Sequence, residues 1–283
     1  MPTKPQKILA ENKSKKHPEL TLNDKAISSF TEIPDLPNLT HLTRLSLAHN
    51  KIKSLPPSIS NLKNLTHLTL FNNNLQDLPS SLVNLDKLIS LNLGMNKLSN
   101  LPRMFCFGSH NAAIANGHMD QYSHEPSFYG NLQVLELSYN NLNENTLPDS
   151  LFDNRNLRAL YLSDNDFEYL PQGLQKLSQT LEVLALRSND LIALPNYLGD
   201  FTNLKELILC QNRLVVLPPE FSNLKQFKET SRNYENTCLD LEGNHFVLPL
   251  MHKMGDIGGL LDYIRESAYI GPKFFDFSQT KFL

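Results

Sequence analysis

The chain offers few residues whose type and spacing could support catalysis or metal binding. His110, His118 and His124 follow Cys106 within one polar stretch, and these residue types bind metal ions, but their spacing matches no standard metal site. The run D-N-D at 164–166 resembles the start of a calcium loop, yet no ligand glutamate follows at the required distance. The sequence contains no phosphate-binding loop, nucleophile elbow, zinc-protease motif or dinucleotide-binding glycine pattern. We therefore predict a non-enzymatic protein with no catalytic residue, no cofactor and no metal site.

Composition and charge narrow the class of protein further. The 283 residues carry a formal charge of -3 and a pI near 6.3, which argues against a nucleic-acid or membrane-surface partner. No apolar run approaches the ~20 residues of a membrane helix, and the first residues lack the apolar core of a signal peptide. The 3 cysteines are odd in number and show no C-x-x-C spacing. We expect a cytoplasmic protein without an integral membrane segment, in a reducing compartment.

A repeat runs along most of the chain, and L-R-A-L-Y-L-S-D-N-D-F-E-Y-L-P at 157–171 is its clearest copy. The repeat follows the pattern L-x-x-L-x-L-x-x-N-x-L-x-x-L-P, with an apolar residue and a further leucine after the proline. Successive asparagines are separated by steps of 23, 23, 44, 25, 24, 23 and 32 residues. The asparagines are Asn50, Asn73, Asn96, Asn140, Asn165, Asn189, Asn212 and Asn244. Repetition at this period is typical of a solenoid, whose units bury their apolar faces only against their neighbours.

Each position of the repeat has a structural interpretation. The alternation L-x-L predicts a short strand with its leucines in the core, and the rest of the unit supplies the crossover that a parallel sheet needs. The asparagine stands where the strand turns, and its amide can satisfy backbone groups that the turn buries, so we expect an asparagine ladder. The predicted fold is α/β: a right-handed leucine-rich-repeat solenoid with a parallel concave sheet, short 3₁₀ or irregular convex segments and helical caps.

The departures from the repeat define the expected organisation. The step of 44 indicates an inserted loop at 104–130, which we expect to be exposed, and the step of 32 indicates a polar insertion at 225–237. Beyond residue 249 the repeat stops and apolar residues follow helical spacing. The predicted domains are an N-terminal capping segment at 1–19, about nine repeat units at 20–249, a capping helix at 250–270 and a tail at 271–283.

Some large side chains on the predicted concave face are not required by the repeat. An apolar stripe is expected from Phe71, Met95, Tyr139 and Tyr161. Charges on the same face include Glu136, Asp164 and Arg187. Large apolar residues exposed together usually mark a protein interface, so these seven are the candidate partner-binding residues. The alternative is that they only pack against one another across the strands.

Several stretches resemble the Ras suppressor protein family of intracellular leucine-rich-repeat adaptors. They are L-N-L-G-M-N-K-L-S-N-L-P-R (91–103), Y-N-N-L-N-E-N-T-L-P (139–148), L-R-A-L-Y-L-S-D-N-D-F-E-Y-L-P (157–171), L-K-E-L-I-L-C-Q-N-R-L-V-V-L-P-P-E (204–220) and D-Y-I-R-E-S-A-Y (262–269). The resemblance covers roughly residues 5–270. The insertion after Arg103, the segment at 242–249 and the end of the chain depart from the family pattern.

The resemblance implies an adaptor that binds a LIM domain of PINCH, as a monomer within a hetero-complex that includes integrin-linked kinase and parvin. It further implies a place at cell–matrix adhesions and an effect on Ras and integrin signalling. Two alternatives stay open: a Ras-pathway scaffold that binds a small GTPase or a phosphatase subunit, and a structural spacer whose concave face binds no partner.

Overall fold

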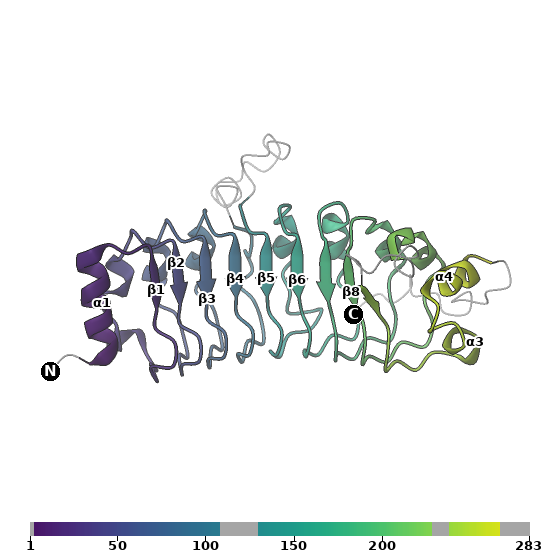
Figure 1. Cartoon of the computed structure of the whole chain (residues 1–283), viewed down its shortest axis with the longest axis horizontal. Helices are drawn as coiled ribbons and strands as arrows, with labels where there is room; N and C mark the ends of the chain where they lie inside the picture. The colour runs from purple at the N-terminus through teal and green to yellow at the C-terminus, as the bar shows by residue number, and fades with distance from the viewer. Residues whose placement is uncertain (1–2, 108–129, 228–237, 267–283) are drawn as a thin grey trace. The chain divides into compact units, whose positions relative to one another are not determined.

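The computed structural model describes residues 3–107, 130–227 and 238–266. It contains two compact units, residues 1–165 (unit 1) and 166–283 (unit 2), which we describe separately. In both, three-residue strands alternate with turns and short 3₁₀ helices (Figure 1). This strand–turn–3₁₀ architecture confirms the predicted leucine-rich-repeat fold class.

Unit 1 begins with a helix and continues as a parallel sheet in which each strand pairs with the next along the chain. Its elements are α1 (Lys4–Lys15), β1 (Glu19–Thr21), β2 (Arg44–Ser46), β3 (His67–Thr69), β4 (Ser90–Asn92), β5 (Val134–Glu136) and β6 (Ala159–Tyr161). The 3₁₀ segments among its described residues are Phe30–Glu32, Leu36–Asn38, Pro57–Asn61, Ser80–Asn84 and Asp149–Asp153.

Unit 2 carries three further parallel strands and two helices among its described residues. They are β7 (Val183–Ala185), β8 (Glu206–Ile208), β9 (Cys238–Asp240), α3 (Leu248–Met251) and α4 (Ile257–Arg265). Its 3₁₀ segments are Gln172–Leu177, Asn196–Asp200, Pro219–Asn223 and Lys225–Phe227. Both α3 and α4 lie within or beside the predicted capping segment at 250–270, and none of the helices in the described ranges is long and apolar enough to cross a membrane.

The L-x-L alternation explains how each strand is placed. The central leucine of a strand points into the core, while the residues on either side of it face outward. In β2 to β8 this leucine is at most 2% exposed. We call the side of the strands opposite the leucines the open sheet face.

The repeat asparagines bridge consecutive repeats by hydrogen bonds. The side-chain oxygen of Asn73 accepts a hydrogen bond from Ile52 N at 3.0 Å, while its amide nitrogen donates to Leu47 O and Leu70 O at 3.0 Å each. Asn140 makes the equivalent bonds to residues of the preceding repeat in unit 1, as Asn212 does in unit 2. Because the side chain of Asn73 is only 6% exposed, these bonds satisfy backbone groups that water cannot reach.

The residue before each ladder asparagine adopts a left-handed backbone conformation. Met95 has φ 53°, Tyr139 has φ 57° and Asp164 has φ 52°. The equivalent position in the last repeat is Gly243, with φ 68°. This left-handed conformation costs a non-glycine residue about 1–2 kcal/mol. It also sets the direction in which the side chains at these positions project.

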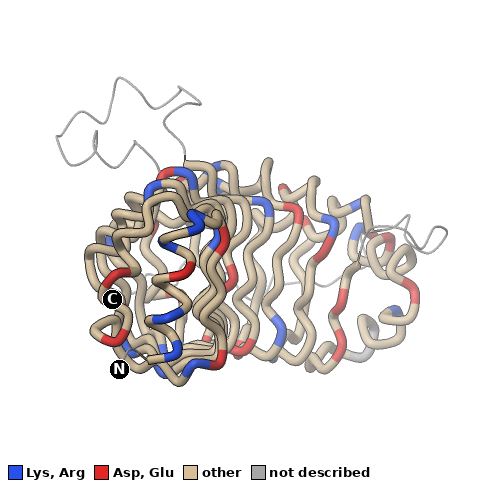
Figure 2. The backbone as a smooth tube through the Cα atoms, turned by 60° about the vertical axis from the view of Figure 1, so that its left-hand side comes forward, with Lys and Arg blue, Asp and Glu red and all other residues tan. Residues whose placement is uncertain are grey.

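The helix α1 closes the first strand of unit 1. Thr3 and Gln6 form a capping box at its start, and Leu9 is buried beneath it. The Asn12 amide donates to Glu19 O at 3.0 Å. The lysines of this helix are exposed and colour much of its tube blue in Figure 2, although Lys13 and Lys15 have carboxylate partners.

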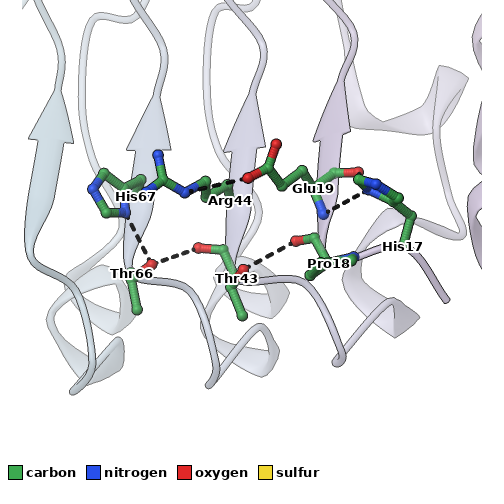
Figure 3. A network of polar contacts seen from close by, with 7 residues as sticks. All are labelled: His17, Pro18, Glu19, Thr43, Arg44, Thr66 and His67. Carbon is green, nitrogen blue, oxygen red and sulfur yellow. Dashed lines mark hydrogen bonds and ion pairs between the residues drawn. The ribbon is translucent and has the colours of Figure 1, made fainter.

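Polar side chains also come directly before β2 and β3 of unit 1. The Thr43 hydroxyl donates to Pro18 O at 3.2 Å, and the Thr66 hydroxyl donates to Thr43 O at 2.9 Å (Figure 3). On the neighbouring row, Arg44 lies 3.4 Å from the Glu19 carboxylate. These contacts add cross-strand links to the backbone ladder.

Residues 105–107, at the described start of the predicted inserted loop, are buried, which differs from the exposed segment expected at 104–130. Phe105 and Phe107 are both 0% exposed, and Asn154 accepts a hydrogen bond from Phe107 N and donates to Phe105 O, each at 2.9 Å. Phe105 takes the place that Leu82 has in the preceding repeat, three residues after the proline, so the outer segment continues before the insertion begins. Residues 108–129, which include the three candidate metal-binding histidines, and 228–237 lie outside the described residues, as does the predicted tail at 271–283.

Candidate functional site

The structure places the predicted partner-binding residues at three different positions of the repeat. Tyr161 lies on the row of Glu136, because β5 and β6 pair these two residues in register. Phe71 lies two residues beyond its strand, whereas Met95 and Tyr139 occupy the left-handed position before the asparagine. The predicted stripe is therefore a patch that crosses rows of the sheet.

A compact set of these residues gathers around Gly94 in unit 1. A Cβ atom added at Gly94 would lie 3.3 Å from the Phe71 ring and 3.3 Å from the Glu136 side chain. The missing side chain at Gly94 thus lets an aromatic ring and a carboxylate approach each other from the two neighbouring strands. We call Phe71, Met95, Glu136 and Tyr139 the sheet-face patch.

Met95 and Tyr139 give the patch its exposed apolar area. Their side chains are 40% and 53% exposed, respectively. They stand on adjacent repeats, joined by the hydrogen bond from Asn96 N to Tyr139 O at 3.2 Å. Large side chains that remain accessible on a rigid sheet offer contact area at low conformational cost.

The carboxylate of Glu136 is the charged member of the patch. Burial raises the pKa of the Glu136 carboxyl, and hydrogen bonds from Ser138 oppose that rise. The Ser138 backbone N–H donates to this carboxylate at 2.6 Å. A half-buried carboxylate beside apolar side chains favours a cationic group on a partner, because the partner charge offsets the cost of burial.

Two residues beside the patch did not figure among the predicted site residues. The His49 ring meets the Phe71 ring edge-on, with centroids 5.5 Å apart. Asn72 Nδ2 lies 2.9 Å from His49 Nδ1. His49 packs against Phe71, and Asn72 holds the His49 ring. Their repeat positions next to Phe71 could have predicted that both lie beside the patch.

The remaining predicted site residues are partly separate from the patch. Asp164 is half-buried in unit 1 at the same left-handed position as Tyr139. Arg187 belongs to unit 2, where its guanidinium donates to Gln211 Oε1 at 2.8 Å. In the part of the chain that the structure describes, no group of three or more His, Cys, Asp or Glu side chains could hold a metal ion.

Comparisons with known proteins agree with the repeat. The family model described as Leucine Rich repeats (2 copies) matches residues 40–82, and the Leucine Rich Repeat model matches 131–154, 156–177 and 203–224. Human Ras suppressor protein 1 is 42% identical over 165 residues, which make up 58% of this chain and 52% of that protein. The mouse protein of the same name is 42% identical over 52 residues, 18% of this chain and 19% of that protein. The chain thus matches at most about half the length of these relatives.

Solved structures show the same fold. A leucine-rich-repeat protein of Leptospira interrogans superposes with a TM-score of 0.65 at 32% identity, covering 87% of this chain and 53% of that one. The leucine-rich-repeat ectodomain of a plant receptor kinase from Arabidopsis thaliana gives a TM-score of 0.57 at 26% identity, covering 77% of this chain and 24% of that chain. That ectodomain was solved in complex with CASPARIAN STRIP INTEGRITY FACTOR 2.

Proposed function

We propose that this chain, a leucine-rich-repeat protein related to Ras suppressor protein 1, is a scaffold that binds a LIM domain of PINCH through its sheet-face patch. The repeat family and this relationship support the broader statement that the chain is a protein-interaction scaffold. The proposal adds the partner, a place at integrin adhesions and an influence on Ras and adhesion signalling.

One observation carries the proposal, namely the exposed apolar side chains of the patch beside a carboxylate. Met95 and Tyr139 are accessible, whereas the strand leucines of the same repeats, Leu91 and Leu135, are 0% exposed. The strand leucines stabilise the fold and leave nothing to contact a partner, so the outward residues are the ones available for recognition. LIM domains are zinc-binding modules, and a basic residue on such a module would meet Glu136.

The proposal is tested by titrating a purified LIM-domain fragment of PINCH into the full chain by calorimetry. We expect binding, and we expect Met95→Ala combined with Tyr139→Ala to weaken it by about 2 kcal/mol or more, as for residues at the centre of an interface. Val215→Ala combined with Ile192→Ala is the matched control, since these apolar side chains are also exposed, at 44% and 37%, but belong to unit 2.

Thermal unfolding separates binding from folding in the same variants. Both double variants should melt close to the wild-type temperature, because their side chains are largely in water. An unchanged LIM-domain affinity for the Met95 and Tyr139 variant would overturn the sheet-face patch as the binding surface. Absence of LIM-domain binding together with capture of a small GTPase would favour the Ras-pathway scaffold instead.

A further inference from the structure

The strongest unassigned feature lies in unit 2, where β9 is the last strand of the described sheet. It pairs with β8 on one side, through Cys238 N to Lys205 O at 2.7 Å and Leu209 N to Asp240 O at 2.8 Å. Alternate residues of a strand direct their backbone groups to opposite sides. The N–H and C=O groups of Leu239 therefore point away from β8, and within the described residues no further strand pairs with them.

The core leucine of β9 is also less covered than its counterparts. Leu184 and Leu207, at the same position in β7 and β8, are each 0% exposed, whereas Leu239 is only half-buried. The helix α4 packs mainly on the 3₁₀ segments Pro219–Asn223 and Lys225–Phe227, and of its residues Ile257 alone lines the same pocket as Leu239. Arg265 fixes this arrangement by donating to Ser222 O at 3.0 Å.

An open groove of about 850 Å³ runs between β9 and the α3–α4 region. Apolar side chains line much of it, and Met251 among them is 53% exposed. The apolar lining residues include Leu239, Phe246, Met251, Met254 and Ile257. Methionine side chains are flexible, so such a wall can adapt to different apolar side chains. We call this cavity the β9 groove.

The charged residues that line the β9 groove are acidic. Its charged lining residues are Asp240 and Glu242, and the described lining contains no lysine or arginine. Asp240 lies on the open face of β9, opposite to Leu239. An added strand would thus place one set of alternate side chains over Leu239 and the other set near Asp240.

We propose that the β9 groove binds an extended segment of a partner protein in which apolar residues alternate with lysine or arginine. The segment adds to β9 as a further strand, so that its backbone pairs with Leu239. The apolar side chains of the segment cover Leu239, Met251 and Met254. Its basic side chains contact Asp240 and Glu242. This site belongs to unit 2 and does not depend on the sheet-face patch of unit 1.

The test uses the full chain and three acetylated, amidated octapeptides. One alternates lysine and valine, one alternates glutamate and valine, and the third is the lysine peptide with proline at a central valine, which removes one backbone N–H. Cys238 lines the groove and is exposed, whereas Cys106 and Cys210 are buried, so the reaction with a disulfide reagent such as DTNB reports on the groove. We expect the lysine peptide to slow this reaction and the other two to have little effect.

Charge-reversal variants test the assigned contacts. Asp240→Lys combined with Glu242→Lys should weaken the lysine peptide by about tenfold or more and favour the glutamate peptide. Asp166→Lys combined with Asp200→Lys is the control, because these exposed carboxylates of unit 2 do not line the groove. For each variant, the Cys238 reaction rate with peptide is compared with its own rate without peptide, and labelled-peptide anisotropy gives the affinity.

Three results would overturn the proposal. The first is equal binding of the lysine and glutamate peptides, or a loss of affinity in the control variant as large as in the groove variant. The second is a wild-type chain that binds no peptide while Phe274→Ser, Phe275→Ser and Phe277→Ser together permit binding, which would make the chain's own end the occupant. The third is a dimer, seen by light scattering, that the lysine peptide does not dissociate.

Discussion

Among the residues that the structure describes, the first strand of unit 1 and the last strand of unit 2 each pair with a strand on one side only, yet their surroundings differ. At β1, Leu20 is only 4% exposed, and α1 lies beside the strand with Leu9 buried. At β9, Leu239 is half-buried and borders an open groove. The helix α1 shields the edge of β1, whereas the edge of β9 borders an open groove. We therefore interpret the β1 edge as purely structural and the β9 edge as able to bind a partner.

Backbone chemistry shows the same contrast. At β1 the outward carbonyl of Glu19 accepts from the Asn12 amide, and Glu19 N lies 3.2 Å from His17 Nδ1. At β9 the outward carbonyl of Leu241 accepts from Asn244 at 2.9 Å, which is the ladder bond, but the strand-centre residue Leu239 has no such side-chain partner among the described residues. The edge of β1 is thus capped by side chains, whereas no described side chain or strand bonds to the backbone of Leu239.

The largest expected effect comes from truncating the two edge leucines. Leu20→Ala should lower the free energy of unfolding by about 2–5 kcal/mol, as for a buried core leucine. Leu239→Ala should cost only about 1 kcal/mol, because part of the side chain is already in water. Urea denaturation of the two variants measures both values. Equal losses would show that the two ends are equally covered in solution.

A second test removes the side chain that caps the β1 edge. Asn12→Ala removes the amide donor from the part-buried carbonyl of Glu19 and removes the contact of Asn12 with His41 Nε2 at 2.9 Å. The expected loss is about 1–2 kcal/mol, because the two hydrogen bonds are part-buried and water replaces them incompletely. Ser14→Ala on the exposed side of α1 is the control and should change the unfolding free energy little, since Ser14 bonds only within its own helix.

Most of the fold could be predicted from the sequence, because the same leucine and asparagine positions recur in successive repeats and each copy predicts the same strand and turn. The alternation of Leu160 and Leu162 specifies a strand, and Asn165 specifies the turn after it. The burial of Phe105 and Phe107 was harder to predict, because their partner is Asn154, 47 residues from Phe107. Asn154 lies six residues after the repeat proline, where two other repeats have Leu85 and Leu177, so a polar residue at an apolar position was the available sign.

The candidate site was less predictable than the fold. The register indicated that Phe71, Met95 and Tyr139 face away from the leucine core, but it did not show that Gly94 allows Phe71 and Glu136 to approach each other. The position of α4 was equally hidden, since helical spacing at 257–264 predicts a buried face but not the surface against which it packs. Contacts between distant segments decide both features, and a single sequence does not contain them.

Hydrogen exchange gives a more local comparison of the two edges. The amide of Leu239 should exchange at least about tenfold faster than that of Leu207, its counterpart in β8, because its N–H faces the open groove. The amide of Glu19 should be slower than that of Leu239, since it is close to His17 Nδ1. NMR-detected exchange resolves the three amides. Protection of Leu239 equal to that of Leu207 would mean that the β9 edge is already paired.

The smallest expected effect concerns the chemistry of the exposed thiol at the open end. Burial raises the pKa of Cys238, and the nearby carboxylates of Asp240 and Glu206 raise it further. Asp240→Asn removes one of these charges, so the pKa falls, the thiolate fraction at pH 8 rises and the reaction with DTNB should accelerate by roughly threefold. Asp200→Asn is the matched control and should leave the rate unchanged. Because Cys106 and Cys210 are buried, an Asp240→Asn rate equal to wild type would mean that this carboxylate does not reach the thiol, and the acidic character assigned to the groove would lose its support.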